Sequence, residues 1–107
     1  MKEAPTHLSG TLHELAEKIL GQEWRALSLL LKNWPGIVGA KLAQDSAPSS
    51  LRYVSRGGSQ QARIVVKIPG ALAPSFQMQE ETMRARINRL MGYDFVEKII
   101  FEHHIKM

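Results

Sequence analysis

The spacing of apolar residues changes along the chain. Up to residue 45 they recur every three or four positions, which is the spacing of a helix with one face on a core. Two shorter runs, 51–55 and 62–68, are rich in β-prone residues. Helical spacing returns from Ala73, and residues 96–101 are again apolar and β-prone. The pattern predicts the order helix, helix, strand, strand, helix, strand.

The first part of the chain predicts two helices. Thr11 and Glu14 have the spacing of a capping box, and the helix that they open is expected to end near Gly21. A second apolar stripe occupies residues 24–34. Pro35 has no backbone N–H, so we expect this helix to kink or restart there.

The later boundaries follow from breaker residues. From Pro35 the apolar face continues to Asp45, and the serine- and proline-rich residues 46–50 are expected to form a loop. A long helix is predicted from Ala73 to Gly92, because glycine often follows the last residue of a helix.

Residues 56–59, Arg-Gly-Gly-Ser, separate the first two strands and predict a hairpin, because glycine adopts the positive φ of a reversal. In the second strand Ile64 and Val66 point to one side and Arg63 and Lys67 to the other, since side chains alternate along a strand. One face of the sheet is therefore expected in the core, and the other is expected to be wet and basic.

These elements predict an α+β fold in which helices pack on one face of a small three-stranded sheet. A length of 107 residues suits a single domain over residues 1–107, with an ordered core of roughly 11–103. The expected core residues are Trp34, Val38, Leu42, Ile64, Val66, Ile87 and Phe101.

Composition narrows the environment and the chemistry. The chain has no cysteine, which excludes disulfides, thiolate metal sites and thiol nucleophiles. No apolar run approaches the length that spans a membrane, and the N-terminus lacks the pattern of a secretory signal. We therefore expect a cytoplasmic protein without a membrane partner.

Positive charge is concentrated in the middle of the chain. Residues 51–91 hold seven basic and two acidic residues, and the whole chain has a net charge of +4. Such an excess favours contact with phosphates, although many surface arginines are only solubilising charges. Tyr53 could stack on a base but shares its strand face with Leu51, which favours the core. The expected nucleic-acid-binding residues are Arg52, Arg56, Arg63, Lys67, Arg86 and Arg89.

Two blocks of the sequence match the pattern of a known family in order and spacing. The first block contains Trp34, Ile37, Val38, Gly39, Leu42, Ala43 and Pro48. The second block contains residues 63–67, Gln77, Arg86, Ile87, Asn88, Gly92, Tyr93 and Val96. Through these blocks, over roughly residues 22–102, the chain resembles the bacterial DciA-like family. The resemblance implies a KH-like domain that binds DNA and contacts the replicative helicase to assist its loading.

Residues 36–39, Gly-Ile-Val-Gly, match the G-x-x-G with which KH domains clamp a nucleic-acid backbone. The two middle residues are apolar, where a clamp needs small polar or basic side chains. Their spacing with Trp34 and Leu42 instead predicts that they belong to the core.

Other candidate chemistry is sparse. Trp24 and Trp34 are expected to anchor the core, with a partner-binding role for Trp24 as the alternative. His103 and His104 point to opposite faces of a strand, so we expect no metal site. The sequence has no phosphate-binding loop, H-E-x-x-H or G-x-S-x-G motif. We therefore expect no catalytic residue, cofactor, small-molecule substrate or enzymatic activity, and no ATP hydrolysis.

Three interpretations of the basic surface stay open. The first is a DNA-binding adapter for the replicative helicase, with little sequence preference. The second is a protein-only interaction module, and the third is an RNA-binding KH-like module. Salt-sensitive DNA binding distinguishes the first from the second, because releasing counterions from phosphates makes affinity fall steeply with salt.

Overall fold

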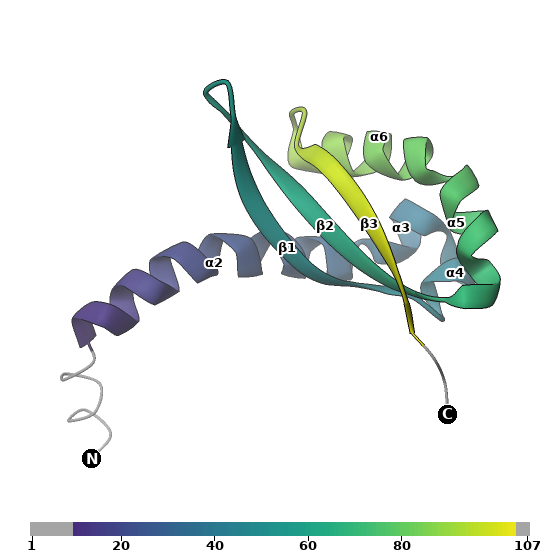
Figure 1. The fold of residues 1–107 in the computed structure, drawn as a ribbon, viewed down its shortest axis with the longest axis horizontal. Helices are drawn as coiled ribbons and strands as arrows, with labels where there is room; N and C mark the ends of the chain where they lie inside the picture. The colour runs from purple at the N-terminus through teal and green to yellow at the C-terminus, as the bar shows by residue number, and fades with distance from the viewer. Residues whose placement is uncertain (1–9, 105–107) are drawn as a thin grey trace, which may run out of the picture.

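A computed structural model describes the backbone of residues 10–104 and the side chains of residues 21–55 and 57–103. Three strands form one sheet in the order β1-β2-β3, and helices lie on one of its faces (Figure 1). This is the α+β architecture expected from the sequence, and it is consistent with a small KH-like fold.

The first helix, α2 (Gly10–Lys32), is continuous, so the prediction of two helices separated near Gly21 is wrong. Gly21 does not adopt a positive φ and therefore does not form the left-handed cap that ends many helices. A glycine that stays helical costs only about 1 kcal/mol relative to alanine. The predicted capping box of Thr11 and Glu14 lies outside the described side chains.

Two short helices follow α2. α3 (Trp34–Val38) has Pro35 in its first turn, so the predicted restart is confirmed. The expected continuation to Asp45 is wrong, because Gly39 interrupts it with a φ of 95° and α4 (Ala40–Ala43) begins after it. A residue with a side chain would be strained in this conformation, so the corner depends on glycine.

The predicted hairpin is confirmed. β1 (Ala47–Arg56) and β2 (Ser59–Pro69) pair in antiparallel fashion. Gly57 and Gly58 form the two-residue turn, with φ values of 54° and 85°. A tight hairpin turn of this kind requires positive φ at both central residues, which explains the pair of glycines.

The expected loop at residues 46–50 is wrong, because β1 already begins at Ala47. Proline is tolerated at position 48 because β1 lies at an edge of the sheet and its register shifts between Pro48 and Ser50. A proline next to serines thus indicated a loop where the structure has an irregular edge strand.

A short 3-10 turn, η1 (Gly70–Leu72), leads from β2 into the next two helices. These are α5 (Ala73–Met78) and α6 (Glu80–Met91), which replace the single long helix that we expected. The chain breaks between them at Gln79, and no glycine or proline marks this position.

Gly92 ends α6 as predicted. It has a left-handed φ of 91°, and its N–H donates to the carbonyl of Asn88 at 2.8 Å. The chain then enters β3 (Val96–His104), which pairs in parallel with β2. Parallel neighbours require a crossover connection, and α5 and α6 provide it.

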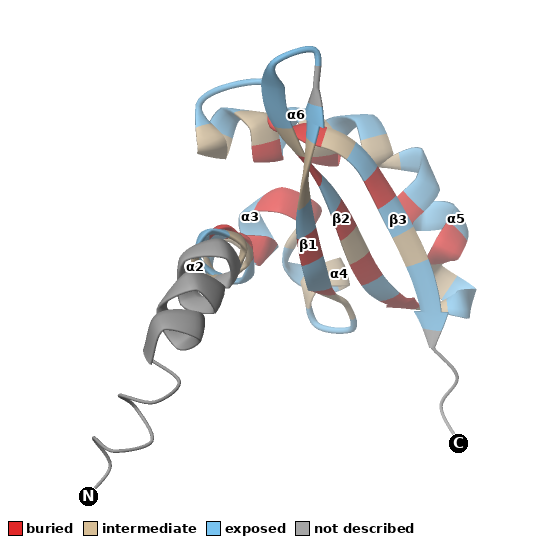
Figure 2. Ribbon diagram, turned by 60° about the vertical axis from the view of Figure 1, so that its left-hand side comes forward, coloured by how far each residue is buried: buried red, intermediate tan, exposed pale blue. Residues whose placement is uncertain are grey.

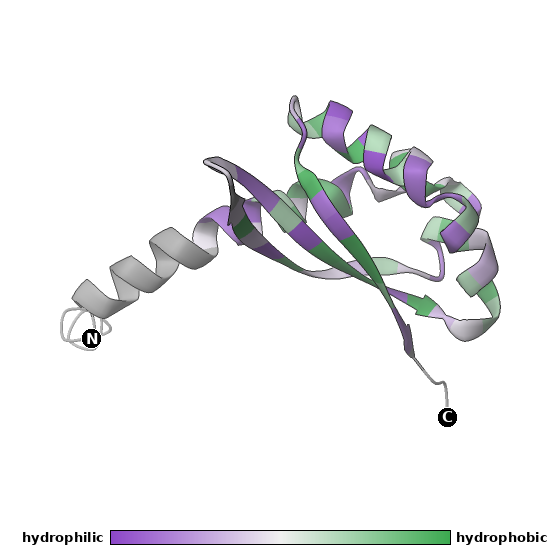
Figure 3. Cartoon of the chain, turned by 45° about the horizontal axis from the view of Figure 1, so that its top comes forward, coloured by the Kyte–Doolittle hydropathy of each residue, from purple (hydrophilic) through white to green (hydrophobic). Residues whose placement is uncertain are grey.

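Alternation along the strands separates the core from solvent. Ile64 and Val66 of β2 are fully buried, whereas Arg63 and Lys67 are exposed, as predicted. Figure 2 shows buried residues alternating with more exposed ones along the strands, and Figure 3 shows hydrophobic residues alternating with hydrophilic ones. The predicted core residues that are buried are Trp34, Val38, Ile64, Val66 and Ile87, and those partly buried against the core are Leu42 and Phe101. The face of the sheet that carries Arg63 and Lys67 is open, and we call it the open face.

Asn88 ties the end of α6 to the start of β3. Its Oδ1 accepts the backbone N–H groups of Phe95 at 2.8 Å and Val96 at 2.9 Å. Asn88→Ala removes the acceptor of two part-buried donors, so we expect the free energy of unfolding in urea to fall by about 1–3 kcal/mol. Asn33→Ala is the control, because Asn33 makes an exposed bond to the Leu29 carbonyl. Equal losses in the two variants would contradict this role.

Candidate nucleic-acid interface

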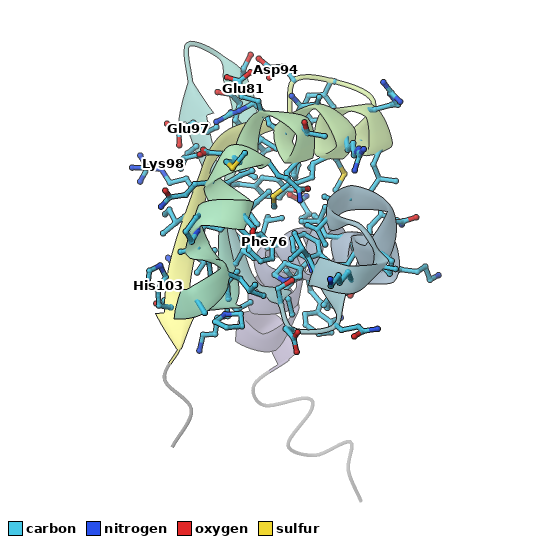
Figure 4. The ribbon with its side chains drawn as sticks, turned by 90° about the vertical axis from the view of Figure 1, so that its right-hand side faces the viewer. Phe76, Glu81, Asp94, Glu97, Lys98 and His103 are labelled. Carbon is cyan, nitrogen blue, oxygen red and sulfur yellow. The ribbon has the colours of Figure 1, made fainter. Side chains whose placement is uncertain are left out.

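Three cations lie in one row across the open face. Arg52 of β1 and Lys98 of β3 are the register partners of Arg63 of β2, and all three are exposed. Neighbouring strands are about 4.8 Å apart, so the row places three positive charges within a width of about 10 Å. Figure 4 shows the Lys98 side chain on the side of β3 away from the helices. Within the described residues, Arg52 and Lys98 form no ion pair.

Two carboxylates of β3 compensate part of the positive charge of the open face. The Arg63 Nε donates to Glu97 Oε1 at 2.9 Å, and the Lys67 Nζ lies 3.9 Å from Glu102 Oε1. Exposed ion pairs of this kind contribute only about 0–1 kcal/mol to stability. Their larger effect is to lower the positive potential around Arg63 and Lys67, so Arg52 and Lys98 are the least compensated cations of the open face.

The other predicted residues lie elsewhere. Arg86 and Arg89 are on α6, in the helix layer, so they do not share a surface with the strand cations. The Arg86 Nη1 donates to the carbonyl of Ile37 at 3.1 Å, near the end of α3, where helix carbonyls lack helical partners. The side chain of Arg56, at the hairpin end of β1, lies outside the described residues.

A family model described as Dna[CI] antecedent, DciA, matches residues 7–101. The chain belongs to the DciA family. Membership confirms the resemblance seen in the two sequence blocks, and it associates the protein with loading of the replicative helicase. A search of curated proteins gives no match to the chain.

The G-x-x-G segment of this DciA-family protein is a packing element. Its two middle residues, Ile37 and Val38, are each only 3% exposed, as the apolar spacing predicted. A clamp needs these positions free to approach a nucleic-acid backbone. The described part of the chain therefore offers no clamp at residues 36–39.

The two tryptophans differ in burial. Trp34 is buried as predicted, and its Nε1 donates to Ser46 Oγ at 3.0 Å. Trp24 is 62% exposed, so the prediction that it anchors the core is wrong. The side of α2 that faces the core carries Ala26 and Leu30 instead. Trp24 lies outside the sector of the helix that the sheet covers.

Tyr53 packs on the core side of β1, as its alternation with Leu51 predicted. Its ring meets Phe95 edge to face, with centroids 6.0 Å apart. Burial raises the pKa of its hydroxyl above the ordinary value, and the nearby Tyr93 and Glu23 raise it further. The hydroxyl of Tyr53 is therefore protonated and neutral at physiological pH. Because the ring packs on the core side of β1, Tyr53 does not lie on the open face.

Charged side chains also cap both edges of the sheet in this DciA-family fold, which the sequence did not reveal. A carboxylate oxygen of Glu23 accepts the backbone N–H of Tyr53 at 2.9 Å, on the edge of β1. On β3, the Arg84 Nη1 donates to the carbonyl of Val96 at 2.7 Å. Exposed strand edges can pair with other chains, and each of these contacts occupies one backbone group of an edge strand.

Two other kinds of site, a metal centre and a membrane-spanning helix, are absent from the described residues. Among the side chains of residues 21–55 and 57–103, no group of three or more histidine, aspartate or glutamate residues is placed to hold a metal ion. Among the helices of residues 10–104, none combines the length and the apolar character needed to cross a membrane.

Proposed function

We propose that this DciA-family protein is a non-enzymatic adapter in helicase loading, and that it holds DNA on the open face of its sheet. The contacting residues are Arg52, Arg63, Lys67 and Lys98, with Arg56 at the hairpin end. The protein acts by binding, because its sequence has no loop that could cradle the phosphates of ATP. Its partners are DNA and the replicative helicase.

The observation that carries this proposal is the row of three cations. Like charges directly opposite each other destabilise an antiparallel pair, and Arg52 lies opposite Arg63. Glu97 compensates Arg63, and a phosphate bound beside Arg52 would relieve the rest of this repulsion. Residues that break a local rule of sheet design concentrate at functional sites, which supports a polyanion as the ligand of the open face.

The open face suits phosphates better than bases. The side chains that alternate onto it include Arg52, Arg63, Val65, Lys98 and Ile100, and none of the described ones is aromatic. Proteins that stack unpaired bases use aromatic side chains on the binding surface. Contacts to the backbone carry no sequence information, so we expect affinity for DNA with little sequence preference.

The test is fluorescence anisotropy of labelled single- and double-stranded DNA at several salt concentrations. Binding should weaken linearly on a log–log plot, with a slope of about −0.7 per phosphate contact for single strands and −0.9 for duplex. A competing single-stranded RNA of the same length distinguishes an RNA-binding module. Absence of binding to either DNA at low salt would remove the DNA part of the proposal.

Glu97 is expected to limit DNA affinity, because its carboxylate compensates Arg63. Glu97→Gln removes one negative charge from the open face and should tighten DNA binding about three- to tenfold at low salt. Glu81→Gln is the control, since it makes the same charge change on α6 in the helix layer. A similar gain in both variants would mean that only net charge matters.

The paired carboxylates favour a second candidate, the protein-only module. Glu97 and Glu102 reduce the potential of the open face, and such mixed charge is common on ordinary protein surfaces. In that case DNA affinity is weak, and it responds equally to charge changes on either layer. The comparison of Glu97→Gln with Glu81→Gln therefore distinguishes the two candidates.

A further inference from the structure

The helix layer carries two adjoining hollows on its outer side. The first, of about 290 Å³, is lined by Trp24, Arg25, Ser28, Leu29 and Lys32 of α2. The second, of about 400 Å³, is lined by Asn33, Gly36, Ile37, Arg86, Arg89 and Leu90. Leu29 lines the first hollow and Asn33 the second, and the Asn33 Nδ2 donates to the carbonyl of Leu29 at 2.9 Å. We call the surface formed by both hollows the α2–α6 strip.

The described side chains that line the strip have one sign of charge. Arg25 and Lys32 line the first hollow and Arg86 and Arg89 the second, and none of the described residues that line either hollow is acidic. This differs from the open face, where Glu97 and Glu102 lie beside the cations. A ligand of the strip is therefore expected to be acidic.

The strip also exposes apolar surface. Trp24 is 62% exposed and Leu29 is 38% exposed, and both line the first hollow. An exposed tryptophan surrounded by arginine and lysine has the composition of a protein-binding hot spot, since tryptophan and arginine dominate such sites. The apolar side chains would contribute nothing to a ligand that is recognised by its phosphates alone.

We infer that the α2–α6 strip binds an acidic amphipathic helix of a protein partner. An apolar side chain of that helix packs against Trp24 and Leu29, and carboxylates on either side pair with Lys32 and Arg89. An amphipathic helix docks in an apolar groove through residues spaced three and four positions apart on its own apolar face, so one such face can contact Trp24 and Leu29 together. The inference rests on the proposed function as an adapter in helicase loading. It assigns the protein partner to the helix layer and DNA to the open face of the sheet.

The probe is a labelled helical peptide of about 20 residues, with leucines along one face and glutamates on both flanks. Its anisotropy is measured with the full chain, beside a peptide in which glutamine replaces every glutamate. We expect the wild type to bind the glutamate peptide at least about tenfold more tightly than the glutamine peptide. Trp24→Ala and Lys32→Glu should each weaken that binding at least about tenfold.

Lys98→Glu is the matched control, because it makes the same charge change on the open face, and Met78→Ala removes an exposed apolar side chain of α5. Both should bind the peptide within about twofold of the wild type. The inference is overturned if the wild type fails to bind the glutamate peptide. It is also overturned if Lys98→Glu weakens binding as much as Lys32→Glu does.

Oligothymidine binding of the same variants keeps this inference separate from the proposed function. If Trp24→Ala weakens oligothymidine binding and leaves peptide binding unchanged, the strip is a DNA surface and the inference is wrong. If the peptide binds as expected and neither the wild type nor any variant binds DNA, the inference about the strip is supported and the DNA part of the proposed function is wrong.

Discussion

Replacing Arg52, Arg63 and Lys98 together by glutamate is expected to weaken binding to single-stranded DNA at least about a hundredfold at low salt. The three side chains form the row across the open face, and each reversal exchanges an attraction to phosphate for a repulsion. Loss of three phosphate contacts should also reduce the slope of log affinity against log salt by about 2. Anisotropy over a salt series measures both effects.

Two controls make this result specific to the open face. Circular dichroism should show an unchanged fold, because all three side chains are exposed. A second triple variant, Arg25, Lys32 and Arg89 to glutamate, makes the same change in net charge in the helix layer, and its DNA affinity should fall by less than about tenfold. Equal losses in the two triple variants would show that DNA responds to total charge rather than to the row.

Trp34→Ala is expected to give the largest loss of stability, about 3–5 kcal/mol. Trp34 is 3% exposed, so truncation leaves a large cavity in the core. Its Nε1 also donates to Ser46 Oγ at 3.0 Å, and that hydroxyl donates to the carbonyl of Leu42 at 2.7 Å. Domains of this size have total stabilities of about 5–15 kcal/mol, so the variant should lose much of its folded population.

Urea denaturation followed by circular dichroism measures the loss, and Trp24→Ala is the matched control. Trp24 is 62% exposed, so the same substitution there should change the free energy of unfolding by less than about 0.5 kcal/mol. Ser46→Ala should fall between the two, at about 1–3 kcal/mol, because it leaves the indole N–H without an acceptor. A similar loss for Trp24→Ala and Trp34→Ala would contradict the burial difference on which both predictions depend.

The sequence predicted the parts of the fold that depend on neighbouring residues. Alternation in β2 gave the buried and exposed faces, because side chains of a strand must point to opposite sides. Gly57 and Gly58 predicted the hairpin, and Gly92 predicted the end of α6, because each adopts a positive φ that other residues avoid. Gly21 shows the limit of this reasoning: glycine permits a helix to end, and the surrounding contacts decide whether it does.

The two tryptophans show that a periodic pattern does not determine which of its apolar residues are buried. Within the apolar stripe of residues 24–34, Leu30 is fully buried, whereas Trp24 and Leu31 are exposed. Only the position of β1, which the Glu23 carboxylate contacts at the Tyr53 N–H, decides which part of that stripe is buried. Trp34 belongs to α3, where the restart at Pro35 sets a new direction, so it reaches the core and Trp24 does not.

By itself, the sequence determined the family, the α+β architecture and the basic character of the strands. Only the tertiary structure decided how the predicted cations with described side chains are distributed, because strand register and helix packing join residues far apart in the chain. The parallel pairing of β2 with β3 brought Lys98 beside Arg63 and placed Glu97 there as well. The crossover through α5 and α6 carried Arg86 and Arg89 to the helix layer. Charge is visible in the sequence, but the surface to which it belongs depends on the topology of the sheet.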